Sequence, residues 1–371
     1  MAEFYSNSID GRKRRKKHSL GRKSLSLLLL DTFVTLAMLL LIFCTLTAII
    51  CQYISPEKSG ILSVIALGAP VIYLLDIIVM FYWVVRWRWY RATAMIVVVI
   101  VGLFYASRYY KFDFDRQYDT SYIERRYSKI MSYNLCDARA EGLEAYIKKH
   151  NPDILCVQEI SSRHEKWPAI SEGYQTDIGK ISDMNNHILT KYRIIRCGEI
   201  EGLSLRNGMW ADLKIKDDTV RVVNLHLKST SIRPEDTQFL EKHEYILDRE
   251  RESKLRSIVE RLVENNSKRA VQARQVADFL KNSPYTTVVC GDFNDVPLSY
   301  TYNLISRNLK DTFSVCADGF THTFNTRYGI LRIDHILLSP SVEVVSYEVD
   351  TEAHYSDHFP VISRVKFNQN R

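Results

Sequence analysis

The 371-residue sequence has no group of cysteines and histidines at the spacing of a zinc site. Its seven cysteines are scattered, and none forms a CxxC pair. Cys156 and Cys290 stand in apolar, strand-like runs, so we expect both to be buried as small hydrophobic residues, with a disulfide as the open alternative. Internal repeats and low-complexity tracts are also absent from the sequence. The length then allows one large domain with a smaller region beside it.

A net charge is missing from most of the chain, although the whole sequence carries +7. Residues 1–23 hold eight basic and two acidic side chains, and Arg86, Arg88 and Arg91 add further positive charge. From residue 108 to the end, basic and acidic residues are equal in number. The C-terminal part therefore does not show the basic excess of a domain that binds polyanions through its overall charge.

Three long apolar stretches precede this neutral part, at residues 32–54, 61–85 and 89–106. Each reaches or approaches the roughly 20 residues that a helix needs to cross a bilayer, and the third is the weakest. A cleaved signal peptide is the main alternative for the first stretch, but its apolar run is too long and two more stretches follow. We therefore predict a basic tail over residues 1–24, a membrane region with three transmembrane helices over residues 25–107, and a polar domain over residues 108–371.

The positive charges predict the direction of these helices. The basic tail should stay in the cytoplasm, and Arg86, Arg88 and Arg91 should bring the chain back to it. The N-terminus is then cytoplasmic and the polar domain extracytoplasmic, and the loss of any one helix would invert this result. Asp76 lies in the middle of the second stretch, where we expect a packing role and leave a functional role open.

The polar domain alternates short apolar runs with helical and polar segments. The runs are rich in β-branched residues, which is typical of strands. Helices are expected over residues 142–150 and over the long, charged segment 238–282, which contains no glycine or proline. The pattern predicts an α/β domain in which helices cover a sheet. The expected strands lie at residues 129–135, 153–160, 220–227, 285–294, 333–338 and 358–367.

Carboxylate, carboxamide or imidazole groups stand at the ends of these runs. Each of them has a structural explanation when taken alone, such as a turn cap or a buried histidine. Together they recur too regularly at strand ends, where a sheet holds side chains rigidly, to be unrelated. The residues are Asn134, Glu159, His226, Asp292, Asn294, Asp334, Asp357 and His358.

The segments around these residues resemble, in the same order, the motifs of the endonuclease/exonuclease/phosphatase superfamily, to which deoxyribonuclease I belongs. The motifs are SYNL, VQE, NLHL, GDFN, RIDHIL and SDHFPV, between residues 129 and 363. GDFN alone would be a weak signal, but the later occurrence of RIDHIL and SDH in the same order makes the resemblance specific. The resemblance implies a four-layer α/β sandwich, with two packed mixed β-sheets and helices outside. It also makes residues 108–371 the expected catalytic domain.

The resemblance further implies a metal site. Glu159 would be the principal ligand, with Asn134 beside it, and Asp357 would assist that ion or hold a second one. Oxygen ligands of this kind suit Mg²⁺ or Mn²⁺ better than zinc.

The remaining motif residues would carry the chemistry. Asp292 would orient and deprotonate the attacking water, and Asn294 would hold that water or a phosphoryl oxygen. His226 and His358 would donate hydrogen bonds to phosphate oxygens as charge builds there. Asp334 would pair with His358 and select its tautomer.

These features together predict a membrane-anchored hydrolase that cleaves a phosphoester or pyrophosphate, most plausibly on a lipid-linked substrate. The neutral charge disfavours a nonspecific nuclease, although an extracytoplasmic nuclease acting on DNA or RNA stays open. A catalytically silent binding module is less favoured, because the motif set is intact. Membrane lipids and a phosphoester are the expected partners, with nucleic acid as the alternative substrate and no protein partner. Weaker candidates for contact with the substrate are Ser356, Thr323 and Arg233.

Overall fold

The computed structural model divides the chain into two compact units. One unit comprises Met1–Leu46 and Val71–Leu103, and the other comprises Thr47–Pro70 and Phe104–Arg371. The second unit thus contains the end of the first apolar stretch, the connector and the start of the second stretch, as well as the polar domain. The residues described are 2–111, 127–176, 185–232, 236, 239, 248–325 and 329–367, with side chains from residue 25 onward.

The N-terminal third of the chain is helical. Its elements are α1 (Ala2–Ile50), the 3₁₀ turn η1 (Cys51–Tyr53), α2 (Gly60–Leu67), α3 (Ala69–Val85) and α4 (Trp89–Ala106). Two helices within the described residues are long and apolar enough to cross a membrane, Leu25–Tyr53 and Trp89–Ala106. α2 and α3 pass the same test only as a pair, and a bend of 65° separates them.

The second of the three predicted transmembrane helices is therefore not a continuous helix. The break falls at Gly68, two residues before Pro70. Proline has no N–H to donate and its ring crowds the preceding turn, so a helix readily ends ahead of it. The first and third predicted helices are present as single elements, and the third, which the sequence made the weakest, is one of them.

Two carboxylates are buried within the helical unit, and each has a partner there. Asp31 accepts hydrogen bonds from Arg86 Nη2 at 2.9 Å and from the Tyr82 hydroxyl at 2.6 Å. Asp76 is 1% exposed and accepts from the Thr45 hydroxyl at 2.5 Å. A buried carboxylate that bonds a neighbouring helix in this way agrees with the packing role expected for Asp76.

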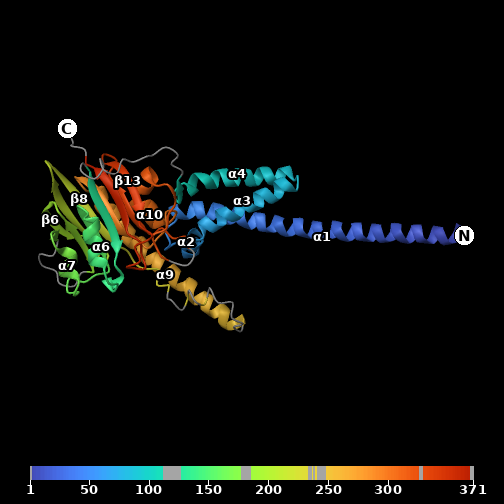
Figure 1. Ribbon diagram of the computed structural model, residues 1–371, viewed down its shortest axis with the longest axis horizontal. Helices are drawn as coiled ribbons and strands as arrows, with labels where there is room; N and C mark the ends of the chain where they lie inside the picture. Colours follow the sequence, from blue (N-terminus) through green and yellow to red (C-terminus); the bar gives the residue numbers. More distant parts are fainter. Residues whose placement is uncertain are drawn as a thin grey trace. The chain divides into compact units, whose positions relative to one another are not determined.

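Two six-stranded sheets pack face to face in the second unit (Figure 1). Each sheet is mixed, because β2 runs parallel to β3 and β8 runs parallel to β9, while the other neighbours are antiparallel. The first sheet has the order β13 (Glu343–Val349), β14 (Val361–Lys366), β2 (Ser128–Asn134), β3 (Ile154–Gln158), β5 (Asn186–Thr190), β4 (Gln175–Thr176). The second has the order β10 (Lys310–Asp311), β12 (Asp334–Leu338), β9 (Thr286–Asp292), β8 (Asp218–His226), β7 (Gly208–Ile215), β6 (Arg193–Glu199).

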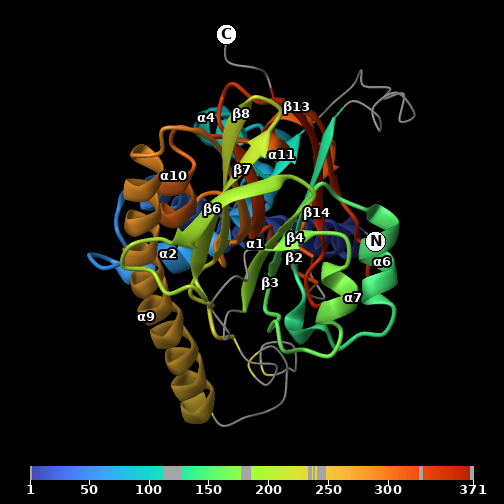
Figure 2. The same cartoon turned by 90° about the vertical axis from the view of Figure 1, so that its left-hand side faces the viewer.

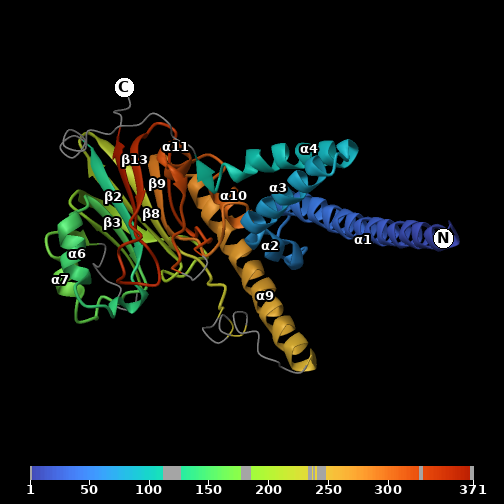
Figure 3. The same ribbon diagram turned by 45° about the vertical axis from the view of Figure 1, so that its right-hand side comes forward.

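Helices cover the outer faces of both sheets (Figure 2). α6 (Leu143–His150) and α7 (Trp167–Ser171) pack on the first sheet, and α9 (Asp248–Lys281) and α10 (Tyr300–Ile305) pack on the second. The N-terminal half of α9 extends beyond the sheet that it covers (Figure 3). This arrangement is the predicted four-layer α/β sandwich. The smaller elements are η2 (Cys136–Ala138), α11 (Thr312–Cys316) and the pair β1 (Tyr110–Lys111) and β11 (Gly319–Phe320).

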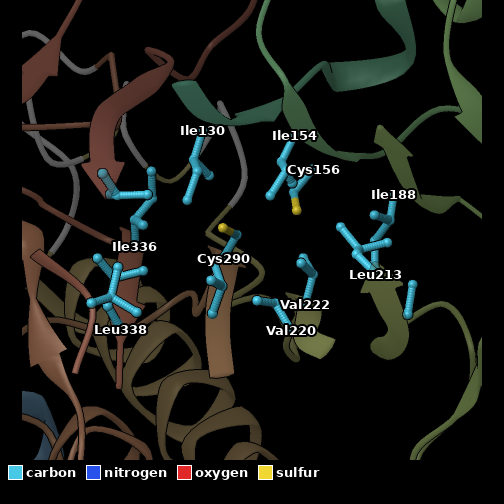
Figure 4. Close-up of a cluster of buried hydrophobic side chains, with 14 of the residues drawn as sticks. Ile130, Ile154, Cys156, Ile188, Leu213, Val220, Val222, Cys290, Ile336 and Leu338 are labelled. Carbon is cyan, nitrogen blue, oxygen red and sulfur yellow. The ribbon is translucent and has the colours of Figure 1, made fainter. Parts of the chain in front are cut away.

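The interior between the sheets consists of side chains at alternate strand positions (Figure 4). Cys156 on β3 and Cys290 on β9 belong to this cluster, and both are fully buried and free of a disulfide. Their expected role as small hydrophobic residues is confirmed. A strand that contributes every second residue to one face needs only β-branched or small apolar residues there, which is how the sequence pattern identified these strands.

All six predicted strands are present, but several others were not predicted. The longer missed strands are β5, β6, β7 and β13, and the two-residue strands β1, β4, β10 and β11 were not predicted either. β6 is largely exposed, and its sequence carries little of the apolar alternation that marks a strand. β13 is mostly half-buried, and its apolar residues were not identified as a strand. The predicted helix 142–150 is confirmed as α6, and the helical segment predicted to start at residue 238 is described as α9 from Asp248 onward.

Candidate active site

The pairing of the strands brings the motif residues to one end of the sandwich. In the first sheet, Asn134 at the end of β2 pairs with Gln158, so Glu159 follows directly beside it. In the second sheet, His226 and Asp334 are the register partners of Asp292 on either side. Parallel neighbours end at the same edge of a sheet, so these side chains collect at that edge.

Asp292 lies at the centre of the group. Its side chain is 1% exposed, and its two oxygens accept three hydrogen bonds. The donors are the backbone N–H of Asn294 at 2.7 Å, the Asn294 amide at 3.0 Å and the Asn134 amide at 3.1 Å. Asn294 has a left-handed φ of 53°, which turns its backbone and side chain back toward this carboxylate. Burial and the neighbouring Asp334 raise the pKa of Asp292 above its ordinary value.

His358 faces Asp292 and is held from behind by Asp334. Its Nδ1 lies 2.9 Å from Asp334 Oδ2, and its Nε2 lies 3.7 Å from Asp292 Oδ2. Burial lowers the pKa of His358, but the charges of Asp334 and Asp292 outweigh it and raise that pKa to about 10. His358 is therefore a cation at neutral pH. The ring of Phe324 packs against it at a centroid distance of 4.9 Å.

His226 and Glu159 form a second pair on the other side of Asp292. His226 Nε2 lies 3.3 Å from Glu159 Oε1 and 3.9 Å from Asp292 Oδ2. The amide of Asn134 donates to the same Glu159 oxygen at 3.1 Å. The hydrogen bond from His226 is the main reason why the pKa of Glu159 falls to about 2. Burial lowers the pKa of His226, whereas Glu159 and Asp292 raise it, and the net shift is upward.

Asp357 lies at the exposed margin of the group. Ser356 connects it to the buried part, because the Ser356 hydroxyl donates to the Asn134 carbonyl at 2.7 Å and lies 3.3 Å from Asp357 Oδ1. The thiol of Cys136 is adjacent, and burial together with the negative charge of Asp357 raises the pKa of Cys136 to about 12. The structure thus brings Asp357 to the rim of the site and the other predicted residues to its interior.

Two sets of side chains offer ligand atoms for a cation. Asp292, Asp334 and His358 each have a ligand atom within 4.8 Å of the others. The bond between His358 and Asp334 already accounts for the approach of these two groups, because each neutralises the buried charge of the other. Glu159 is different, since it is ionised and its side chain is 39% exposed, with Asn134 and Asp357 near it. The set around Glu159 is therefore better placed than the set of Asp292, Asp334 and His358 to bind a solvated ion.

Thr323 has a structural role in this region. It is fully buried, and its hydroxyl accepts hydrogen bonds from the backbone N–H groups of Ile333 and Asp334, both at 3.0 Å. Thr323 therefore holds the backbone at Asp334 in place. Arg233, another weak candidate, lies outside the described residues.

The sequence-based analysis missed Asn224 and Gln158, which lie beneath the site. Both are fully buried, and Gln158 Nε2 donates to Asn224 Oδ1 at 2.7 Å. A signal for Asn224 was present, because it stands two residues before His226 and period-2 alternation puts both on the same face of β8. The bond joins the two sheets directly below Glu159 and His226.

Comparison with known proteins identifies the family of this region. A family model described as endonuclease/exonuclease/phosphatase family matches residues 131–358, more than half of the chain. A second model, for a domain of unknown function, matches residues 31–109. No curated protein matches the chain.

Solved structures match the chain at low sequence identity. They include humanized TDP2 of D. rerio, at 16% identity, with a TM-score of 0.46 and coverage of 65% of this chain and 99% of that one. The mannosyl-6-phosphatase Bt3783 of Bacteroides thetaiotaomicron has 21% identity, a TM-score of 0.44 and coverage of 65% and 100%. The 3′ phosphatase NExo of Neisseria, bound to a product DNA hairpin, has 19% identity, a TM-score of 0.45 and coverage of 65% and 100%.

The substitution Asp334→Asn tests the pairing at the centre of the site. The amide keeps the size of the carboxylate but removes the charge that orients His358 and keeps it cationic, so we expect the rate of hydrolysis at saturating substrate to fall about 10²- to 10³-fold. Asp153→Asn is the matched control, since Asp153 lies at the opposite end of β3 and bonds the Lys129 backbone at 2.8 Å. Equal rates in both variants would contradict the assignment of Asp334.

Proposed function

We propose that this chain, which belongs to the endonuclease/exonuclease/phosphatase family, hydrolyses a phosphoester or pyrophosphate on a lipid-linked substrate at a membrane surface. Membership of this family makes the chain a phosphoric ester hydrolase. The substrate class, the metal, the roles of the site residues and the membrane topology are the proposed parts.

The convergence of two imidazoles on one carboxylate supports the proposal most strongly. His226 Nε2 and His358 Nε2 lie 3.9 Å and 3.7 Å from the same oxygen of Asp292. A phosphoryl group at this point meets two hydrogen-bond donors and a base together. That combination stabilises negative charge on phosphoryl oxygens while water attacks.

Asp292 takes the role of the base that receives a proton from the attacking water. Its carboxylate is held by the backbone N–H and the side-chain amide of Asn294, so it is oriented before the substrate arrives. Both amide hydrogens of Asn294 are already donated, to Asp292 and to the Leu227 carbonyl. Asn294 therefore holds the water through its Oδ1 atom.

His226 and His358 donate to the non-bridging oxygens of the phosphoryl group. His358 keeps its proton because Asp334 neutralises it and occupies Nδ1, which leaves Nε2 to face the substrate. His226 differs, because its Nε2 lies 3.3 Å from Glu159 Oε1, so this bond has to open before His226 donates to the substrate. No covalent intermediate is needed, since water is the nucleophile.

Glu159, Asn134 and Asp357 are the proposed ligands of Mg²⁺ or Mn²⁺. Their oxygens are hard donors, and the ionised, half-exposed Glu159 fits a cation that keeps part of its water shell. In the structure the nitrogen of the Asn134 amide faces Glu159, so coordination through Asn134 Oδ1 requires the amide to turn over. When bound, the ion supplies Lewis-acid polarisation of a phosphoryl oxygen.

A lipid-linked substrate is favoured by the connection between the site-bearing unit and the apolar helices. Residues 47–70 belong to that unit, so the chain enters it directly from the helix Leu25–Tyr53. It enters a second time from the helix Trp89–Ala106. Two such connections keep the site close to lipid headgroups, and the neutral charge of residues 108–371 offers little nonspecific attraction for nucleic acid.

The same connectivity favours an odd number of membrane crossings. Both Thr47–Pro70 and Phe104–Arg371 lie in one compact unit, so the intervening helices α3 and α4 must leave that unit and return to it. α3 alone has 17 residues, which is near the lower limit for a span. With α1 as the first crossing, the basic tail and the site-bearing unit lie on opposite sides, and the positive charge places the tail in the cytoplasm.

A substrate comparison tests the proposed function. The full-length chain in detergent, with Mg²⁺ or Mn²⁺, should release phosphate from micelles containing a lipid-linked pyrophosphate or a phospholipid and should leave plasmid DNA uncut. Asp292→Ala and His358→Ala should each remain folded and lower this release by about 10²- to 10⁴-fold, because each removes a group that acts on the phosphoryl centre.

Two outcomes would contradict this assignment. Nicking of the plasmid without turnover of lipid would make the chain a tethered nuclease and keep the site residues. Full activity of either variant on lipid would remove the proposed roles of Asp292 and His358.

A labelling experiment tests the topology. Cys197 is an exposed cysteine of β6, so a membrane-impermeant maleimide added to intact spheroplasts should label it. The variant Cys197→Ser is the control and should lose this label. Labelling of Cys197 only after permeabilisation would place the site-bearing unit in the cytoplasm and would rule out three crossings.

A further inference from the structure

The segment that follows the proposed catalytic residues is a buried loop without regular secondary structure. It runs from Asp295 to Ser299, between β9 and α10, and every residue in it is buried. Backbone groups of a buried loop need partners, because no water reaches them. The position of this loop also determines where Asn294 lies, since the chain continues directly into it.

The donors that hold this loop come from the ends of the two apolar helices. Arg108 Nη1 donates to the Pro297 carbonyl at 3.0 Å. The Cys51 thiol, which has a shorter bond to the Ala48 carbonyl at 3.0 Å, lies 3.6 Å from the Leu298 carbonyl. Cys51 lies at the end of the helix Leu25–Tyr53, and Arg108 follows the helix Trp89–Ala106 by two residues. All these residues belong to the same compact unit as the loop.

Gln52 holds Arg108 in this position. The same Nη1 atom of Arg108 donates to Gln52 Oε1 at 3.0 Å, and Gln52 Nε2 donates to the Ile49 carbonyl at 2.7 Å. Gln52 is fully buried, and its own carbonyl accepts from Asn303 of α10 at 3.1 Å. The two helix ends are thus bonded to each other and to both sides of the loop.

The other side of the loop is held from within the sandwich. Arg269 of α9 is fully buried and donates to Asp295 Oδ2 at 3.2 Å. Asp295 Oδ1 in turn accepts the backbone N–H of Val296 at 3.0 Å. With Arg269 on one side and Arg108 on the other, the loop is held at two points, and Asn294 precedes the first of them.

We propose that Arg108, held by Gln52, is a positioning residue for Asp292 and Asn294. Asn294 keeps its left-handed backbone and its two bonds to Asp292 only while the loop after it stays in place. Removal of the Arg108 guanidinium leaves the Pro297 carbonyl and the Gln52 amide oxygen without this donor, and the loop loosens. The ends of the apolar helices are therefore part of the catalytic fold, beyond their role as an anchor.

The variant Arg108→Met in the full-length chain tests this role, which rests on the proposed hydrolysis for its kinetic part. We expect kcat to fall by at least about tenfold with KM within about twofold, because Arg108 acts on Asp292 and Asn294 and does not contact substrate. Arg108→Lys should give an intermediate kcat, since its ammonium can reach one of the two acceptors. Hydrogen exchange should rise in the peptide that covers residues 292–299 in Arg108→Met.

Glu57→Gln is the matched control. Glu57 lies in the same inter-helix segment, and its carboxylate pairs with Arg274 of α9 at 2.5 Å and accepts from the Ser55 hydroxyl at 3.1 Å. It should leave kcat and the exchange of residues 292–299 unchanged. An equal loss of kcat in Glu57→Gln and Arg108→Met would mean general destabilisation and would overturn the proposal.

The exchange measurement separates this proposal from the proposed function. If residues 292–299 exchange hydrogen at the wild-type rate in Arg108→Met, then Arg108 does not hold the loop in place, whatever the activity of the variant. If hydrogen exchange of residues 292–299 rises in Arg108→Met but the wild-type chain hydrolyses none of the tested phosphoesters, the role of Arg108 in holding the loop is supported and the proposed function is overturned.

Discussion

The hydrogen bonds of Asn224 join the two sheets at the end where the site lies. Its amide donates to the carbonyls of Val157 at 2.9 Å and His187 at 2.8 Å, and its oxygen accepts from Gln158 at 2.7 Å. Every polar group of this side chain is therefore used in a buried environment, where an unpaired amide would be costly. The buried Asn186 amide adds a further bond between the sheets, to the Asn224 carbonyl at 3.0 Å, so these amides together set how the two sheets meet.

The site depends on that junction because its groups come from both sheets. Gln158 directly precedes Glu159, and Asn224 stands two residues before His226. The hydrogen bond between Gln158 and Asn224 therefore sets how closely Glu159 and His226 approach each other. The resulting pair then lowers the pKa of Glu159 to about 2. A group ionised in this way can bind a cation, whereas the buried Asp292 beside it has a raised pKa and suits a base.

The sequence predicted the strands and the site residues for different reasons. The six predicted strands carry dense β-branched patterns, whereas the exposed β6 carries little apolar alternation. The site residues were predicted because each follows a strand within a motif, and the fold then brings them together. Neither pattern contains information about non-local partners. Two features therefore emerged only from the structure: the bond of the Thr323 hydroxyl to the Asp334 backbone, and the inclusion of residues 47–70 in the site-bearing unit.

The dependence of hydrolysis on a divalent cation tests the account most directly. The wild-type chain should lose phosphate release in EDTA and regain it with Mg²⁺ or Mn²⁺. Glu159→Gln keeps the size of the side chain and removes its charge, so the cation concentration for half-maximal rate should rise at least about tenfold. Full activity of the wild-type chain in EDTA, or the same cation requirement in Glu159→Gln, would contradict a metal-dependent site built around Glu159.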